Sequence, residues 1–113
     1  MTVENIQLQL REFARERDWE KFHTLKNLIL ALVGETGELA AVVQWLDSVD
    51  LEFFKDNPDV FSAFEEEVAD VFIYLARIAD ISGIDLLDAA RRKMQKNAER
   101  YTVDKSRGNA HKH

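Results

Sequence analysis

Cysteine is absent from this 113-residue chain, and the residues that commonly form turns are scarce, with four glycines and one proline. Without cysteine the chain has no disulfide, no thiolate-bound zinc and no cysteine nucleophile, so any metal must be bound through oxygen or imidazole. A β-rich or loop-rich fold would need more glycine and proline at its turns. With few such residues and 46% of the chain hydrophobic, we predict an all-α fold, a four-helix bundle. A chain this short builds only a modest core of its own, so we expect the bundle to assemble into oligomers.

Long apolar runs are also missing. The longest, Leu28 to Val33, is far too short to span a bilayer, and the N-terminus has no basic-then-apolar signal pattern. We therefore expect a soluble, cytoplasmic protein. The formal charge of −6 argues against nucleic acid or an anionic membrane as a partner, since both attract basic surfaces. An acidic protein that acts on phosphates would need a divalent cation as an intermediary.

Apolar residues at helical spacing, together with capping residues, predict four helices in one domain. Asn57 and Pro58 mark the start of the third helix as its N-cap and first helical residue, and Gly83 marks its end. The four expected helices cover Thr2 to about Arg17, Thr24 to about Asp47, Pro58 to about Ser82, and the segment that follows the N-cap Asp85 and reaches Tyr101.

Two segments lie outside these helices. Leu51 and the Phe53-Phe54 pair predict a short turn, anchored by apolar side chains, between the second and third helices. From Thr102 onward, basic residues outnumber acidic ones by three to one. We expect residues 1–101 to form the helical domain and residues 102–113 to form a flexible basic tail.

Two of the expected helices carry acids three residues apart within an apolar stripe. At ~100° per residue, Glu35 falls within about 20° of Leu28 and Val42, and Glu38 lies about 60° to one side. Glu67 and Asp70 repeat this arrangement on the third helix. Burying one unpaired carboxylate costs several kcal/mol, and converging carboxylates also repel one another. An all-oxygen cluster without histidine therefore predicts a site for a hard divalent ion, Mg²⁺ or Mn²⁺.

Most acid pairs at this spacing lie on a solvated helix face, and Glu65 and Glu66 fit that interpretation. Two pairs that both interrupt an apolar stripe favour the metal site instead. Protonation is another way to neutralise one or two acids, whereas Arg77, like Arg17 and Lys26, looks peripheral.

Gly34 and Gly37 bracket Glu35, and each disfavours the helix by about 1 kcal/mol relative to alanine. Either close packing of a neighbouring helix or close approach of a ligand would explain both glycines.

Several aromatic and polar residues have both a structural and a functional interpretation. Trp19 and Trp45 either fill the core or stack on a nucleobase. Lys93 and Asn97, four residues apart, either face solvent or contact a polyphosphate from the fourth helix. Tyr74, one turn beyond Asp70, is placed to pack under a sugar, and none of the three histidines is assigned a catalytic role.

Through nearly its whole length the sequence resembles the MazG-like all-α NTP pyrophosphohydrolases, specifically their dCTP pyrophosphatase branch. Glu35-Thr-Gly-Glu38 and Glu67-Val-Ala-Asp70 match the two halves of that family's metal signature. Leu10 and Thr102 depart from the pattern of this branch, because they stand where close relatives have His and Pro. The flanking matches are Glu16 to Trp19, Phe22-His23, Asn27, Leu30 to Glu35, Gln44-Trp45, Lys93-Met94, Asn97, Arg100-Tyr101 and Ser106 to Gly108.

The resemblance implies Mg²⁺-dependent hydrolysis of a nucleoside triphosphate, with dCTP or a modified dCTP favoured, to the monophosphate and pyrophosphate. It also implies a homodimer or a dimer of dimers, and it places Trp19 and Trp45 in a nucleobase pocket. Among the acids we prefer Glu38 as general base, with Lys93 and Arg107 stabilising the leaving pyrophosphate.

We weigh three alternatives to this assignment, and two of them stay open. One is a non-catalytic oligomerisation or metal-sensing module, in which the acids hold a structural ion. Another is a pyrophosphohydrolase for dUTP or for a broad range of nucleotides. A di-iron carboxylate bundle fits poorly, because no histidine follows Glu35 or Glu67 at the required spacing.

Overall fold

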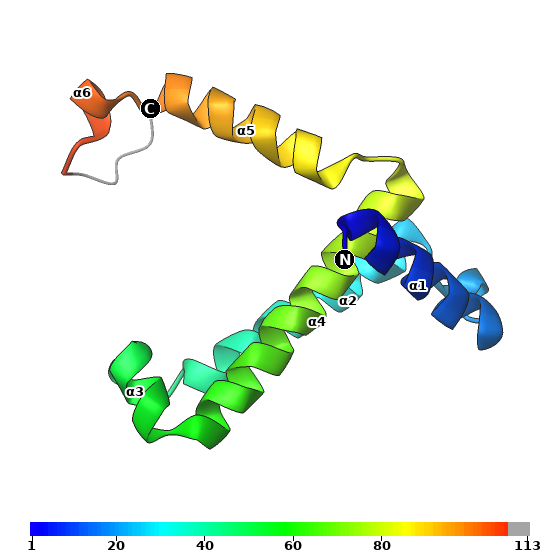
Figure 1. Ribbon diagram of the computed structural model, residues 1–113, viewed down its shortest axis with the longest axis horizontal. Coiled ribbons are helices and arrows are strands. Elements are labelled where there is room, and N and C mark those ends of the chain that lie inside the picture. The colour runs from blue at the N-terminus through cyan, green and yellow to red at the C-terminus, as the bar shows by residue number, and fades with distance from the viewer. Residues whose placement is uncertain (109–113) are drawn as a thin grey trace.

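The computed structural model describes residues 1–108, and every regular element within them is helical (Figure 1). The all-α prediction is therefore confirmed. The elements are α1 (Val3–Glu16), the short 3₁₀ helix η1 (Glu20–Phe22), α2 (Leu25–Val43), α3 (Leu51–Asp56), α4 (Pro58–Ser82), α5 (Leu86–Arg100) and α6 (Val103–Ser106).

Local capping chemistry sets most of the helix ends where the sequence predicts them. The Thr24 hydroxyl accepts a hydrogen bond from the backbone N–H of Asn27 at 3.2 Å, and Asp85 caps α5 in the same way through Asp88 at 3.0 Å. Pro58 begins α4, and Gly83 ends it with a φ of 73°, a left-handed conformation that glycine adopts without strain.

Two helix boundaries differ from the prediction. Residues 51–56 form the helix α3 rather than a turn, because Asp50 accepts a hydrogen bond from the Phe53 N–H at 2.8 Å and so caps a helical turn. Phe54 then packs against Phe61 and Phe64 of α4, with ring centroids 5.2 and 5.0 Å apart. Helix α2 ends at Val43, four residues before the expected end at Asp47.

The segment beyond residue 101 contains α6, so the predicted tail is helical at Val103–Ser106. The rest of the predicted tail, residues 109–113, lies outside the described residues and includes two of the three histidines. In the part of the chain that the structure covers, no helix is both long enough and apolar enough to cross a membrane.

The helices pack unevenly. Figure 1 shows α2 and α4 running side by side in opposite directions, α1 crossing the C-terminal part of α4, and α5 extending away from this group. The radius of gyration is 17.6 Å, compared with about 13 Å expected for a compact chain of this length. The four predicted helices therefore do not close into a bundle within one chain.

The core of the single chain is correspondingly small. Its buried hydrophobic residues are Ala14, Leu28, Ala76 and Ala79, and no large side chain among the described residues is fully buried. Many large apolar side chains on α2, α4 and α5 are exposed instead, including Leu30, Val33, Phe72, Leu75 and Met94. A single copy thus leaves much of its apolar surface uncovered.

Candidate metal and nucleotide site

The antiparallel pairing of α2 and α4 brings acids from both helices together. Glu35 and Glu38 on α2 and Glu67 on α4 each offer a carboxylate oxygen, and these oxygens all lie within 4.8 Å of one another. The helical periodicity that places each acid pair within an apolar stripe is the reason for this convergence, because the two stripes face each other.

The electrostatics of the cluster suit a cation. Burial is the main cause that raises the pKa of Glu35 and of Glu67, and the negative charges of Glu38 and Asp70 raise both further. Oε2 of Glu35 and Oε2 of Glu67 are buried without a hydrogen-bond partner. Unpartnered buried carboxylate oxygens are costly, so a divalent ion with oxygen ligands fits this donor set.

Asp70 lies at the edge of the cluster rather than among its closest oxygens. It is one helical turn beyond Glu67, and its charge acts on the pKa values of both Glu35 and Glu67. Asp70 and Glu35 also line the same cavity. Asp70 therefore lies outside the three closest carboxylates but shares the cavity with Glu35.

That cavity, of about 230 Å³, opens between α1, the segment before α2, and the α2–α4 pair. Trp19 contributes one wall, where its ring meets Phe13 edge-on at a centroid distance of 5.7 Å. Acidic and aromatic side chains thus share one space, which suits a ligand with a charged end and a planar end. The lining residues are Leu10, Phe13, Trp19, His23, Leu28, Glu35, Asp70, Ile73, Tyr74 and Arg77.

Other predicted site residues lie apart from this cavity in the single chain. Trp45 follows the end of α2, is 86% exposed and does not line the cavity. Lys93 and Asn97 are exposed on α5, which extends away from the α2–α4 pair (Figure 1), and Arg107 is exposed after α6. None of these four residues lines the cavity that Glu35 and Asp70 share.

Arg77 contradicts its predicted peripheral position, because it is only 8% exposed. It lies seven residues after Asp70, so both residues face the same side of α4, toward α1 and the segment before α2. Helical spacing shows that Arg77 shares a face with Asp70, but it does not show which segment covers that face. His23, to which no catalytic role was assigned, also lines the cavity, as does Leu10.

The glycines beside Glu35 face open space. A side-chain carbon added at Gly34 or Gly37 would meet no atom of the described residues within 4 Å. Neither close helix packing nor another contact within the chain therefore explains them. By contrast, Glu65 and Glu66 are exposed, as predicted for a solvated face.

The fold is all-α, and two paired helices direct carboxylates toward each other beside a cavity with aromatic walls. These features define a class of helical proteins with a carboxylate site suited to a cation. The family model for the MazG nucleotide pyrophosphohydrolase domain matches residues 23–103. The chain belongs to this family.

Individual relatives agree with this assignment. The chain is 46% identical over 112 residues to dCTP pyrophosphatase 1 of Rattus norvegicus and 42% identical over 112 residues to that of Homo sapiens. These alignments cover 99% of the chain but 66% of each relative. A crystal structure of a pyrophosphatase from Archaeoglobus fulgidus matches with a TM-score of 0.77 and 40% identity, over 88% of this chain and 91% of that one.

Proposed function

We propose that this protein is a Mg²⁺-dependent nucleoside triphosphate pyrophosphohydrolase that converts dCTP, or a modified dCTP, to the monophosphate and pyrophosphate. The observation that carries the proposal is the position of the three converging carboxylates beside a cavity lined by Trp19 and Tyr74. Membership of the MazG family and similarity to the mammalian dCTP pyrophosphatases support the same chemistry. Such an enzyme would remove unwanted nucleotides from the cellular pool.

Glu35, Glu38, Glu67 and Asp70 would hold the cation, and Mg²⁺ is preferred because every donor is a carboxylate oxygen, with Mn²⁺ as a substitute. Bound Mg²⁺ supplies positive charge that offsets the triphosphate and makes a nearby water more acidic. Glu38 is exposed, unlike the half-buried Glu35 and Glu67, and so is the acid best placed to accept a proton from that water.

We also propose that the active form is a homodimer or a dimer of dimers. The single chain has almost no core and leaves the apolar faces of α2, α4 and α5 uncovered. In an oligomer, α5 of a second copy would bring Lys93 and Asn97 toward the triphosphate. A second copy would also supply Trp45 and Arg107, which are exposed and do not line the cavity within one chain.

Product analysis tests the proposed chemistry. With dCTP and Mg²⁺ we expect the monophosphate and pyrophosphate in equal amounts, because charge at the leaving pyrophosphate is offset by the cation and by Lys93 and Arg107. Chromatography separates this outcome from dCDP with orthophosphate, which would mean that a different bond is cleaved. A panel including dUTP, the other deoxynucleotides and 5-modified dCTP sets the base preference. No turnover of any triphosphate would favour the non-catalytic module.

Metal binding is expected to stabilise the fold. Mg²⁺ should raise the Tm, since it removes a carboxylate repulsion that is much weaker in the unfolded chain. Glu35→Gln and Glu67→Gln should lose most of this rise, and each should raise the Tm of the metal-free protein near neutral pH by removing a charge whose pKa is already elevated. Circular dichroism melts with Mg²⁺ or EDTA measure both effects.

Glu66→Gln is the matched control, because Glu66 neighbours Glu67 on α4 but is exposed to solvent. It should keep the full Mg²⁺ effect. Equal Tm values with and without excess Mg²⁺ in the unmodified protein would show that the acids do not form a cation site.

A further inference from the structure

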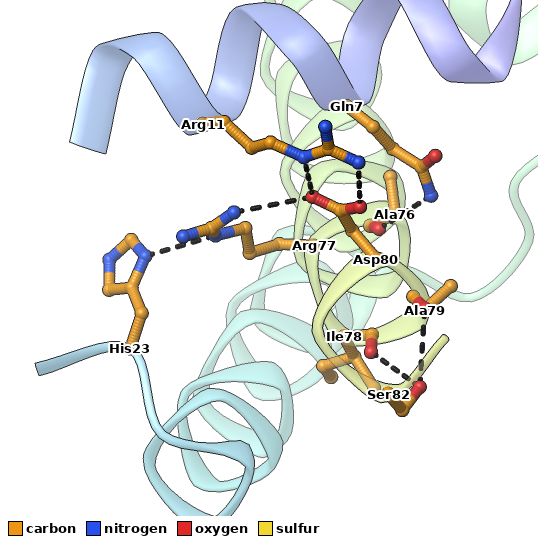
Figure 2. Close-up of polar contacts among 9 residues, drawn as sticks. All are labelled: Gln7, Arg11, His23, Ala76, Arg77, Ile78, Ala79, Asp80 and Ser82. Atoms are coloured by element: carbon orange, nitrogen blue, oxygen red, sulfur yellow. Dashed lines mark hydrogen bonds and ion pairs between the residues drawn. The ribbon is translucent and has the colours of Figure 1, made fainter. Parts of the chain in front are cut away.

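A chain of polar contacts links three segments around the buried Arg77 (Figure 2). Nε of Arg77 donates a hydrogen bond to Nδ1 of His23 at 3.2 Å, and Nη1 lies 3.4 Å from Oδ2 of Asp80. Asp80 in turn accepts two hydrogen bonds from Arg11 of α1, one of them from Nε at 2.6 Å. The contacts thus tie α1 and the segment before α2 to the same face of α4.

Arg77 and Asp80, at the centre of these contacts, are held firmly in place. The side chains of Arg77 and Asp80 are 10% and 8% exposed. Hydrogen bonding from Arg11 is the main cause that lowers the pKa of Asp80, so the carboxylate stays charged and holds the Arg77 guanidinium in place. A buried guanidinium held by a charged carboxylate has little freedom to reorient, and its Nε–H remains directed at His23.

The contact with Arg77 determines where His23 carries its proton. A guanidinium can only donate hydrogen bonds, so Nδ1 of His23 must present its lone pair, and the proton of the neutral ring lies on Nε2. Burial, and then the positive charge of Arg77, lower the pKa of His23, which favours the neutral ring. Within residues 1–108 the ring has no other hydrogen bond, so its Nε2–H is an uncommitted donor.

His23 lines the same cavity as two of the four acids. It lies beside Trp19, with ring centroids 6.5 Å apart, and shares the cavity lining with Tyr74, Glu35 and Asp70. A planar base seated against Trp19, with its phosphates toward the carboxylates, would therefore have the His23 ring near its edge. One oriented N–H donor beside the Trp19 ring favours a base edge that accepts a hydrogen bond.

We propose that His23 is a specificity-determining residue that donates its Nε2–H to the acceptor edge of the nucleobase, and that Arg77 is a positioning residue that fixes the His23 ring for this role. Cytosine accepts this hydrogen bond at N3, where uracil carries a hydrogen. Because O2 is an acceptor in both bases, the bond that distinguishes them is the one to N3. The inference rests on the proposed function, since it assumes that the cavity takes a nucleotide base.

The experiment compares His23→Asn with His23→Gln. An asparagine oxygen can replace Nδ1 as the acceptor for Arg77 but leaves no donor at the Nε2 position, whereas the longer glutamine can place an amide N–H there. Loss of one neutral hydrogen bond predicts a rise of about 3-fold to 10-fold in KM for dCTP in His23→Asn. We expect little change in kcat, a lower preference for dCTP over dUTP, and partial recovery of both in His23→Gln.

Arg77→Lys tests the positioning role, because a lysine cannot replace the directed Nε–H and the ring would lose its fixed tautomer. It should shift KM and base preference in the same direction as His23→Asn. The inhibition constant of inorganic triphosphate with Mg²⁺, a probe without a base, should be unchanged in all three variants. Lys26→Ala, an exposed change at the start of α2, is the matched control and should behave like the unmodified protein.

Three results would overturn the inference: an unchanged dCTP preference in His23→Asn, equal losses for dCTP and dUTP, or an equal loss of triphosphate binding. Inactivity of the unmodified protein toward every triphosphate would instead refute the proposed function. In that case, dCMP and dUMP titrations followed by Trp19 fluorescence in a Trp45→Phe background still test His23. Equal affinity for the two monophosphates in both Trp45→Phe and Trp45→Phe/His23→Asn would then refute its role.

Discussion

Replacing Glu38 with glutamine is expected to lower kcat by about a hundredfold or more, the scale of losing a general base or a metal ligand. The substitution keeps the size of the side chain but removes its charge and its capacity to accept a proton. Glu38 lies with Glu35 and Glu67 in the cluster of oxygens within 4.8 Å, so both roles depend on its carboxylate. Asp70→Asn should have an effect of similar size.

Steady-state kinetics at saturating Mg²⁺, combined with the Tm measurement, separate the two roles of Glu38. A general base that is not a ligand would leave the Mg²⁺-dependent rise in Tm intact, whereas a ligand would not. Glu66→Gln should keep full activity, because that side chain is exposed and points away from the cluster. Full activity in both Glu38→Gln and Asp70→Asn would refute the proposed chemistry.

A negative charge on the apolar face of α2 is expected to prevent assembly and, with it, activity. Leu30 and Val33 are 59% and 64% exposed and lie three residues apart on one side of the helix, next to the open Gly34. Covering a large apolar side chain contributes about 1.5–3 kcal/mol, and burying an unpaired charge costs several kcal/mol. Leu30→Asp or Val33→Asp should therefore weaken association by at least about a hundredfold.

Sedimentation velocity at micromolar concentration measures this effect. Lys26→Asp also places an aspartate on α2, at an exposed polar position and with an even larger change in charge, and it should leave the oligomer intact. A stable monomer in the unmodified protein would contradict the prediction.

Mixing of subunits then tests whether α5 of one copy completes the active site of another copy. Copies with Glu38→Gln and copies with Lys93→Ala should each be nearly inactive alone, and refolded together they should recover activity, because a mixed oligomer contains sites with both native residues. No recovery would mean that Glu38 and Lys93 act from the same copy.

Much of the local structure follows from the sequence because it depends on neighbouring residues. Pro58 and Gly83 predict both ends of α4, since one lacks a backbone N–H and the other adopts a positive φ without strain. The helix α3 was missed, because a single capped turn of six residues leaves too little periodicity to recognise.

The sequence by itself determined the all-α fold and the placement of an acid pair within each of two apolar stripes, because helical periodicity and capping act over a few residues. Only the tertiary structure decided that Arg77 is buried against His23, 54 residues away in the chain, that Trp45 does not line the cavity, and that α5 extends away from the α2–α4 pair (Figure 1). Such contacts depend on how helices cross and on which apolar faces a single copy can cover. Those are properties of the packed chain, which no local pattern of residues contains.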